Sequence, residues 1–127
     1  MSDLESLYRR YLARCNARKF DELGEFLQDP LLLNGQPISR AGFADRLFAL
    51  LEAVPDFRWE LVDLVTSGSK LAVRNQTTGT PRAPWLGVEP NGKAVAVTEL
   101  VFYTYRDGKI AEIWVLFDLA AIRAQLS

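Results

Sequence analysis

Residues 94–118 have the sequence AVAVTELVFYTYRDGKIAEIWVLFD, in which two mostly apolar segments flank the turn sequence RDGK at positions 106–109. Asp-Gly tolerates the positive φ angles of a type I′ turn, so this stretch predicts a β-hairpin with strands at residues 94–105 and 110–117. Two further segments with period two, residues 57–65 and 70–80, are joined by a short turn at residues 67–69. The C-terminal half is therefore predicted to form a four-stranded antiparallel meander.

The N-terminal half has a helical period instead. Apolar residues recur at three- and four-residue steps from Leu4 to Cys15, which predicts an amphipathic helix over residues 3–17. The S-x-x-E pattern of Ser2 and Glu5 favours a start near Ser2. The other predicted elements are a helix at 20–27 ended by Asp29-Pro30, a short strand at 31–34, a helix at 40–53 between Ser39 and Pro55, a long loop at 81–92 and a final helix at 119–126.

Helices followed by a meander give an α+β order, in which the helices must cover one face of a curved sheet. The 127 residues have the length of one domain, predicted to span residues 1–127. A net charge of −1 with no run of like charge argues against a nucleic-acid partner. No apolar run reaches the roughly 20 residues of a membrane span, and one cysteine with no signal-peptide pattern indicates the cytoplasm.

The chain contains no histidine. It cannot form a Ser-His-Asp triad, a Cys-His pair or a three-histidine zinc site, and no segment has the spacing of a phosphate loop or a calcium loop. We therefore expect no metal site. Acid–base chemistry must rely on carboxylates, Tyr or Lys.

Asp118 is the first candidate for that chemistry. It ends a row of alternating residues with Glu112, Trp114 and Leu116, so an inward-facing row would desolvate its carboxylate and raise its pKa. Asp118 also directly precedes the last predicted helix, where it could simply be the N-cap. The residues alone leave both roles open.

Other polar residues share strand faces with apolar ones. Glu99 lies on a face with Val97 and Val101, either as a second buried carboxylate or at an exposed position that meets a partner subunit. Asn75 and Thr77 belong to the face predicted to be buried, and they could orient a carbonyl group or merely favour a strand. Tyr11, in the first helix, is either a core residue or a ligand contact.

Several segments resemble the SnoaL-like polyketide cyclase family, which is related to nuclear transport factor two and ketosteroid isomerase. The resemblance rests on YLARCNARKFDEL at residues 11–23, AVR at 72–74 with TGT at 78–80, WLGV at 85–88 with NGK at 91–93, and RDGKIAEIW at 106–114 running to Asp118. It covers nearly the whole chain in the same order and spacing.

This resemblance implies a cone-shaped α+β barrel with an internal pocket for a small hydrophobic ligand, formed by N-terminal helices packed into a curved, mostly antiparallel sheet of four or more strands. It also implies a homodimer. The founding cyclases close a ring by intramolecular aldol condensation without a cofactor, and their aspartate in the pattern W-x-x-x-D matches Trp114 and Asp118. Pro81 stands where many relatives have histidine, and Val101 stands where they have an acidic residue, so a second carboxylate would have to be Glu99 or Glu112.

The leading hypothesis is a cofactor-independent cyclase-like or isomerase-like enzyme that acts on a small hydrophobic carbonyl compound. Asp118 would move the proton, and Asn75 or a tyrosine would stabilise the enolate. Trp85, Phe102, Trp114 and Leu116 would enclose the ligand, although Trp85 in its loop could instead plug the core. The alternatives are a non-catalytic ligand-binding or dimerisation module of the same fold, and a hydrolase or dehydratase on this scaffold.

Overall fold

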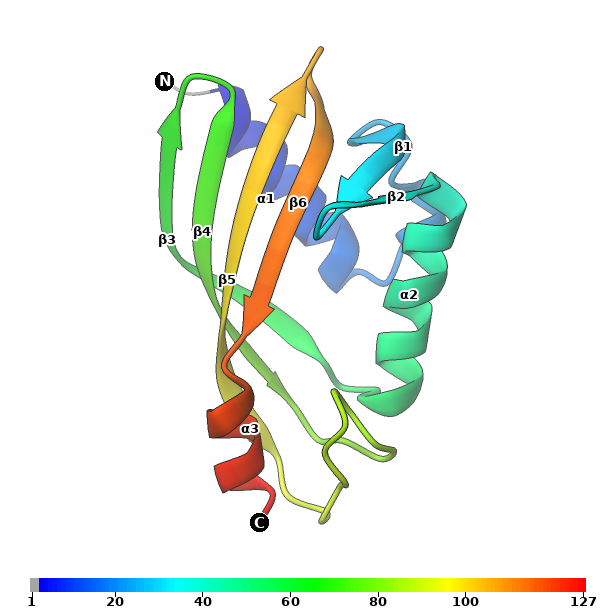
Figure 1. Ribbon diagram of the computed structural model, residues 1–127, viewed down its shortest axis with the longest axis vertical. Coiled ribbons are helices and arrows are strands. Elements are labelled where there is room, and N and C mark those ends of the chain that lie inside the picture. The colour runs from blue at the N-terminus through cyan, green and yellow to red at the C-terminus, as the bar shows by residue number, and fades with distance from the viewer. Residues whose placement is uncertain (1–2) are drawn as a thin grey trace.

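The computed structural model describes residues 3–127, which form helices packed into a strongly curved sheet (Figure 1). The elements are α1 (Asp3–Asn16), the 3-10 helix η1 (Phe20–Glu22), β1 (Leu27–Leu33), β2 (Gln36–Ile38), α2 (Arg40–Ala53), β3 (Arg58–Ser67), β4 (Lys70–Gly79), β5 (Val95–Arg106), β6 (Lys109–Phe117) and α3 (Leu119–Gln125). The fold is the predicted cone-like α+β architecture. The sheet is open rather than closed into a barrel, because β2 and β3 are its two edges.

The meander predicted from the C-terminal half is confirmed. Its four strands pair antiparallel in chain order, and the turn between β5 and β6 has positive φ at Asp107 (54°) and Gly108 (76°) as a type I′ turn requires. Two strands extend the sheet beyond this meander, since β1 pairs parallel with β6 and antiparallel with β2. The sheet is therefore six-stranded and mixed.

The helix predicted at residues 20–27 is wrong beyond Glu22. Only residues 20–22 are helical, and the chain is already in β1 at Leu27, where the Phe26 carbonyl accepts a hydrogen bond from Ile110 of β6 (2.7 Å). Pro30 lies within β1, where the register with β6 shifts between Leu27 and Leu32. Pairing with a strand some 80 residues later overrides the local helical pattern in this segment.

The other helices agree with the predictions. Ser39 Oγ accepts the backbone N–H of Gly42 at 2.9 Å as the N-cap of α2. The predicted cap at Ser2 lies outside the described residues. Figure 1 shows α1 crossing one face of the sheet, α2 standing along the open side of the curve and α3 at the narrow end. None of the described helices has the length and hydropathy to cross a membrane.

The two faces of the sheet differ in what covers them. The predicted buried row of β4 is confirmed, since Leu71, Val73, Asn75 and Thr77 all face the core. On β5 the inward row includes Glu99, Val101 and Tyr103, and on β6 it is Ile113, Val115 and Phe117. Helices α1 and α2 line the cavity on this inner face, whereas Leu100, Phe102, Trp114 and Leu116 are exposed on the opposite face of β5 and β6.

Phe102, Trp114 and Leu116 were expected to point inward, and this expectation is wrong. Phe102 pairs with Trp114 across β5 and β6, and Leu116 pairs with Leu100, on the solvent side of the sheet. The alternation along these strands is as predicted. Both faces carry large apolar side chains, so the sequence pattern did not determine which face the helices cover.

Candidate functional site

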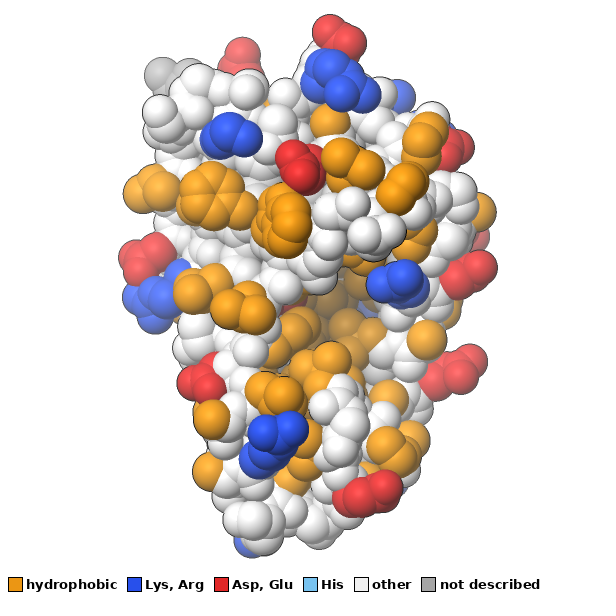
Figure 2. Space-filling view, viewed as in Figure 1, with side chains coloured by type: hydrophobic (Ala, Val, Ile, Leu, Met, Phe, Trp, Pro, Cys, Tyr) orange, Lys and Arg blue, Asp and Glu red, His pale blue; other side chains and the backbone are white. Residues whose placement is uncertain are grey.

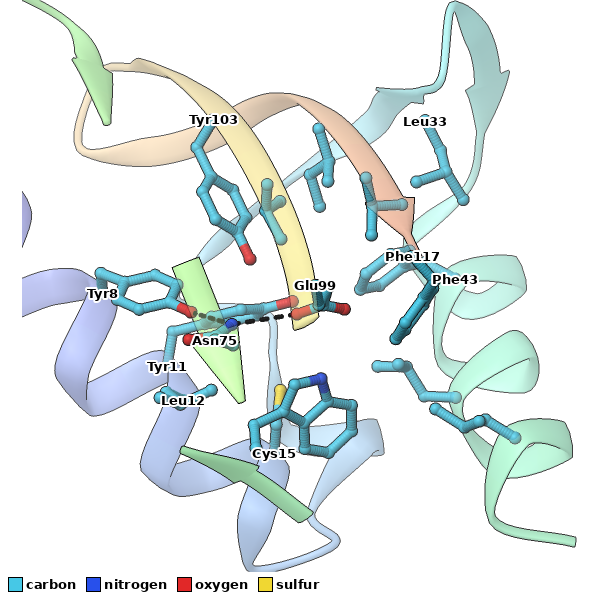
Figure 3. Close-up of a pocket in the computed structure, with 16 residues that line it drawn as sticks. Tyr8, Tyr11, Leu12, Cys15, Leu33, Phe43, Asn75, Glu99, Tyr103 and Phe117 are labelled. Atoms are coloured by element: carbon cyan, nitrogen blue, oxygen red, sulfur yellow. Dashed lines mark hydrogen bonds between the residues drawn. The ribbon is translucent and has the colours of Figure 1, made fainter. Parts of the chain in front are cut away.

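A cavity of about 130 Å³ lies between the inner face of the sheet, α1 and α2 (Figure 3). Sixteen residues line it: Tyr8, Tyr11, Leu12, Cys15, Leu33, Phe43, Leu47, Leu50, Trp59, Asn75, Glu99, Val101, Tyr103, Ile113, Val115 and Phe117. Figure 2 shows a hollow near the centre of this side of the molecule with apolar side chains around it. An apolar cavity of about 150 Å³ can bind benzene, so this space is suited to one small ring.

The local structure of each element explains why its side chains reach the cavity. On α2, Phe43, Leu47 and Leu50 follow one another at steps of four and three residues, so they share one helical face. On β6, Val115 and Phe117 are two residues apart and therefore point to the same side. These two elements provide an apolar wall opposite the polar groups.

Glu99 is the acidic group of the cavity. Its side chain is only 6% exposed, and Oε1 accepts a hydrogen bond from Asn75 Nδ2 at 2.9 Å. Burial raises the pKa of Glu99 from its ordinary value of 4.5 to about 7, and hydrogen bonds from Asn75 and the Trp59 side chain oppose that rise. A carboxyl group with such a pKa can both accept and return a proton near neutral pH.

Asn75 connects Glu99 to helix α1. Its Nδ2 also donates to the hydroxyl oxygen of Tyr8 at 3.0 Å, so both amide hydrogens are used and the Glu99 side chain is held at one oxygen (Figure 3). The pairing register explains this contact, because Asn75 and Glu99 are directly opposite on β4 and β5. The result is a chain of hydrogen bonds across the floor of the cavity.

The remaining titratable groups of the cavity stay neutral. Burial raises the pKa of the Cys15 thiol to about 12, and it raises the pKa values of Tyr8, Tyr11 and Tyr103 well above 10. Figure 3 shows the Tyr103 hydroxyl group pointing into the space beside Glu99. Neutral tyrosines can donate hydrogen bonds to a ligand.

The expectation that Asp118 lies inside the pocket is wrong. Asp118 is exposed at the end of β6, where it is the N-cap of α3 and its Oδ1 accepts the backbone N–H of Ala121 at 3.1 Å. The residue before it, Phe117, is the one that faces the cavity. Of the two roles left open for Asp118, the structure places it in the capping position.

The other predicted site residues separate into two groups. Asn75, Glu99 and Tyr11 line the cavity together. Thr77 is buried but is not one of the cavity-lining residues, and its hydroxyl donates to the carbonyl of Val97 at 2.9 Å. Trp85 plugs the core, with its ring 5.6 Å from that of Phe57.

The prediction omitted several residues that the structure brings to the cavity. Tyr103 and Val101 are four and two residues beyond Glu99 on the same strand, so alternation from Glu99 would have identified both. The contribution of Phe43 depends on where α2 lies relative to the sheet, which no local pattern specifies. In the described part of the chain, no three or more Cys, Asp and Glu residues cluster as metal ligands would.

Comparison with known proteins agrees with this architecture. The family model for SnoaL-like polyketide cyclases matches residues 5–126. A SnoaL-like polyketide cyclase from Agrobacterium tumefaciens strain C58 is 35% identical, with a TM-score of 0.94 over all of both chains. No curated protein sequence matches the chain.

More distant solved structures share the fold. TsrD from Streptomyces laurentii has a TM-score of 0.87 at 23% identity, over 100% of this chain and 98% of its own. IdmH from Streptomyces antibioticus has a TM-score of 0.85 at 23% identity, over 98% of this chain and 99% of its own. The match of the family model to nearly the whole sequence shows that this chain belongs to the SnoaL-like polyketide cyclase family.

Proposed function

We propose that the protein is a cofactor-independent enzyme that enolises a small hydrophobic carbonyl compound, with Glu99 as the acid–base group in place of Asp118. One observation carries this proposal. Among the cavity-lining residues of the described chain, Glu99 is the only carboxylate, and it is buried in an otherwise apolar site. Membership in a family of polyketide cyclases supports a carbonyl substrate.

The first step is the transfer of a proton from the carbon next to the carbonyl group. Asn75 holds the Glu99 carboxylate through its hydrogen bond to Oε1, and the carboxylate removes the proton. The electron pair of the broken C–H bond moves onto the carbonyl oxygen, and the Tyr103 hydroxyl donates a hydrogen bond to this developing enolate. Asn75 acts as a positioning residue, because it holds the carboxylate rather than touching the substrate.

The second step forms the new bond. The enolate carbon attacks a second carbonyl group of the same molecule, and the resulting alkoxide takes back the proton from Glu99, so no net proton is consumed. General acid–base catalysis contributes about 10²–10⁴-fold to such a reaction, and the orientation of the two carbonyl groups in a confined site contributes the rest.

A deuterium-exchange experiment tests the first step without knowledge of the natural substrate. Cyclohexanone and cyclopentanone are of the size that the cavity suits, and their α-hydrogens exchange with D₂O at a rate that NMR measures. The wild-type protein should accelerate the exchange, and Glu99→Gln should not. Binding of these ketones without any acceleration would instead indicate the non-catalytic ligand-binding module.

Dehydration of a β-hydroxy ketone is a second candidate, because two polar groups lie close together in the cavity. The Asn75 Nδ2 and Glu99 Oε1 atoms are 2.9 Å apart. This reaction begins with the same proton transfer, and the returning proton then leaves with the hydroxyl group as water. An α,β-unsaturated ketone formed from 3-hydroxycyclohexanone would favour dehydration over ring closure, and its absorbance would show it directly.

The outer face of the sheet supports the homodimer. Leu100, Phe102, Trp114 and Leu116 form one exposed apolar patch across β5 and β6, and Leu116 is 70% exposed. Ala72 of β4 continues this outer patch, which also has a shallow concavity. Exposed apolar patches of this kind mark association sites, and a second copy of the chain offers the same patch in return.

A further inference from the structure

The charge of the cavity is unbalanced. Some exposed carboxylates of the described chain have cationic partners: Glu25 pairs with Arg10 and Arg14, and Asp63 pairs with Arg74. Glu99 is far more buried than these, yet no Lys or Arg is among the residues that line its cavity in residues 3–127. When Glu99 ionises, the cavity therefore holds a negative charge whose only compensation is hydrogen bonding.

Aromatic rings surround this charge. Tyr8, Tyr11 and Tyr103 approach from one side, and Phe43, Trp59 and Phe117 complete the lining (Figure 3). The rings of Tyr8 and Tyr103 are 5.2 Å apart, and those of Tyr11 and Tyr103 are 6.2 Å apart. The faces of aromatic rings attract cations, most strongly where water is excluded.

A buried carboxylate is stabilised by a close cation, and an aromatic cage adds a second attraction for the same ligand. We propose that the cavity is a binding site for small arylalkyl ammonium ions of the size of benzylammonium, with the ammonium group on the Glu99 carboxylate. The aryl ring then lies against the apolar wall of α2 and β6. This inference does not require that the protein catalyse any reaction.

The groups that face Glu99 determine how this binding depends on pH. They are Tyr8, Tyr11 and Cys15 from α1, Trp59 from β3, Asn75 from β4 and Tyr103 from β5, whereas α2 and β6 contribute only apolar side chains. The tyrosines and the thiol stay neutral below pH 9 because burial raises their pKa values. Glu99 is thus the one group of the cavity that changes charge between pH 6 and pH 8.

Calorimetric titration of the full chain with benzylamine, and with benzyl alcohol as the neutral ligand of similar shape, tests the proposal. Benzylamine is a cation at both pH 6 and pH 8, so its affinity should follow the ionised fraction of Glu99 and be about tenfold higher at pH 8. Benzyl alcohol should not show this increase. Binding at pH 6 should also release a proton, so the heat should differ between buffers with different ionisation enthalpies.

Two variants make the result specific. Glu99→Gln should abolish the preference for benzylamine and its pH dependence while it still binds benzyl alcohol. Glu112→Gln removes a carboxylate of the same type outside the cavity and should behave as wild type. Equal affinities of the wild type for the two ligands at pH 8, or an unchanged pH dependence in Glu99→Gln, would overturn the proposal. Neither readout involves turnover, so a failed deuterium exchange leaves the ammonium site standing.

Discussion

Glu99 of β5 and Asp118, which directly follows β6, are two carboxylates of the same hairpin. One is buried and the other is exposed. Glu99 lies on the covered face of β5, bound to one amide and surrounded by rings, and burial raises its pKa. Asp118 follows the last residue of β6, lies in solvent and accepts a backbone N–H of α3. The comparison shows that the burial of a carboxylate depends on which face the helices cover, not on proximity in sequence to aromatic residues.

The largest expected difference between the two carboxylates is in catalysis. Glu99→Gln should lower the rate of α-deuterium exchange into cyclohexanone by about 10²–10⁴-fold, because it removes the only carboxylate that reaches the ligand. Asp118→Asn should retain nearly the full rate, since the side chain is outside the cavity. Full activity in Glu99→Gln together with loss in Asp118→Asn would reverse the assignment.

The second expected difference is in how the free energy of unfolding depends on pH. The folded state favours neutral Glu99, so this residue stabilises the fold fully below pH 4.5, and that contribution is lost as the pH rises toward 7. A pKa rise from 4.5 to about 7 corresponds to about 3 kcal/mol in the free energy of unfolding. Urea unfolding at pH 5 and at pH 8 measures this change in the free energy of unfolding.

Glu99→Gln isolates this contribution, because other carboxylates titrate in the wild type as well. The variant should be the more stable protein at pH 8. The difference between its free energy of unfolding and that of the wild type should become smaller toward pH 5. A constant difference at all pH values would mean that Glu99 titrates as an ordinary exposed carboxyl group.

The two faces of β5 and β6 give a third comparison. Leu116→Arg places a charge in the exposed apolar patch, so the dissociation constant of the proposed dimer should rise by at least about tenfold, as sedimentation equilibrium would show. Ala49→Arg, on the exposed side of α2, is the control and should leave the dimer unchanged. A monomeric wild type would exclude this use of the patch.

The smallest expected effect concerns the cap itself. Asp118→Ala removes the acceptor for the Ala121 N–H and should lower the free energy of unfolding by about 1 kcal/mol, without an effect on ligand binding. Thermal unfolding and calorimetric titration separate the two quantities. A loss of ligand affinity larger than the loss of stability would mean that α3 shapes the cavity.

Much of the fold could be predicted because its signals are local. The Asp107-Gly108 turn, the Ser39 cap and the inward row of Asn75 and Thr77 each follow from a few neighbouring residues. The start of β1 could not be predicted in this way, since only residues 31–34 have a local strand signal, whereas Leu27 pairs with Ile110 of β6. Asn75 and Glu99 were both proposed as site residues, and their contact follows from the strand register.

The assignment of Asp118 failed for a different physical reason. Trp114 and Leu116 are large apolar residues on the solvent side, so hydrophobicity gave the wrong direction for the whole row. The exposed apolar patch on the outer face explains why this apolar row faces solvent rather than the core. A strand that is apolar on both faces requires knowledge of what covers each face before its polar residues can be interpreted.

The cavity has a consequence for how a ligand would act on the whole molecule. Its lining residues come from α1, α2 and five of the six strands, and they extend from Tyr8 to Phe117, so no contiguous fragment of the chain could assemble the site alone. A ligand that occupies it must therefore bind the folded chain and not the unfolded one. At a concentration of 100 times its dissociation constant, such a ligand adds about 2.7 kcal/mol to the free energy of unfolding. Any natural substrate should thus raise the melting temperature, whatever reaction follows.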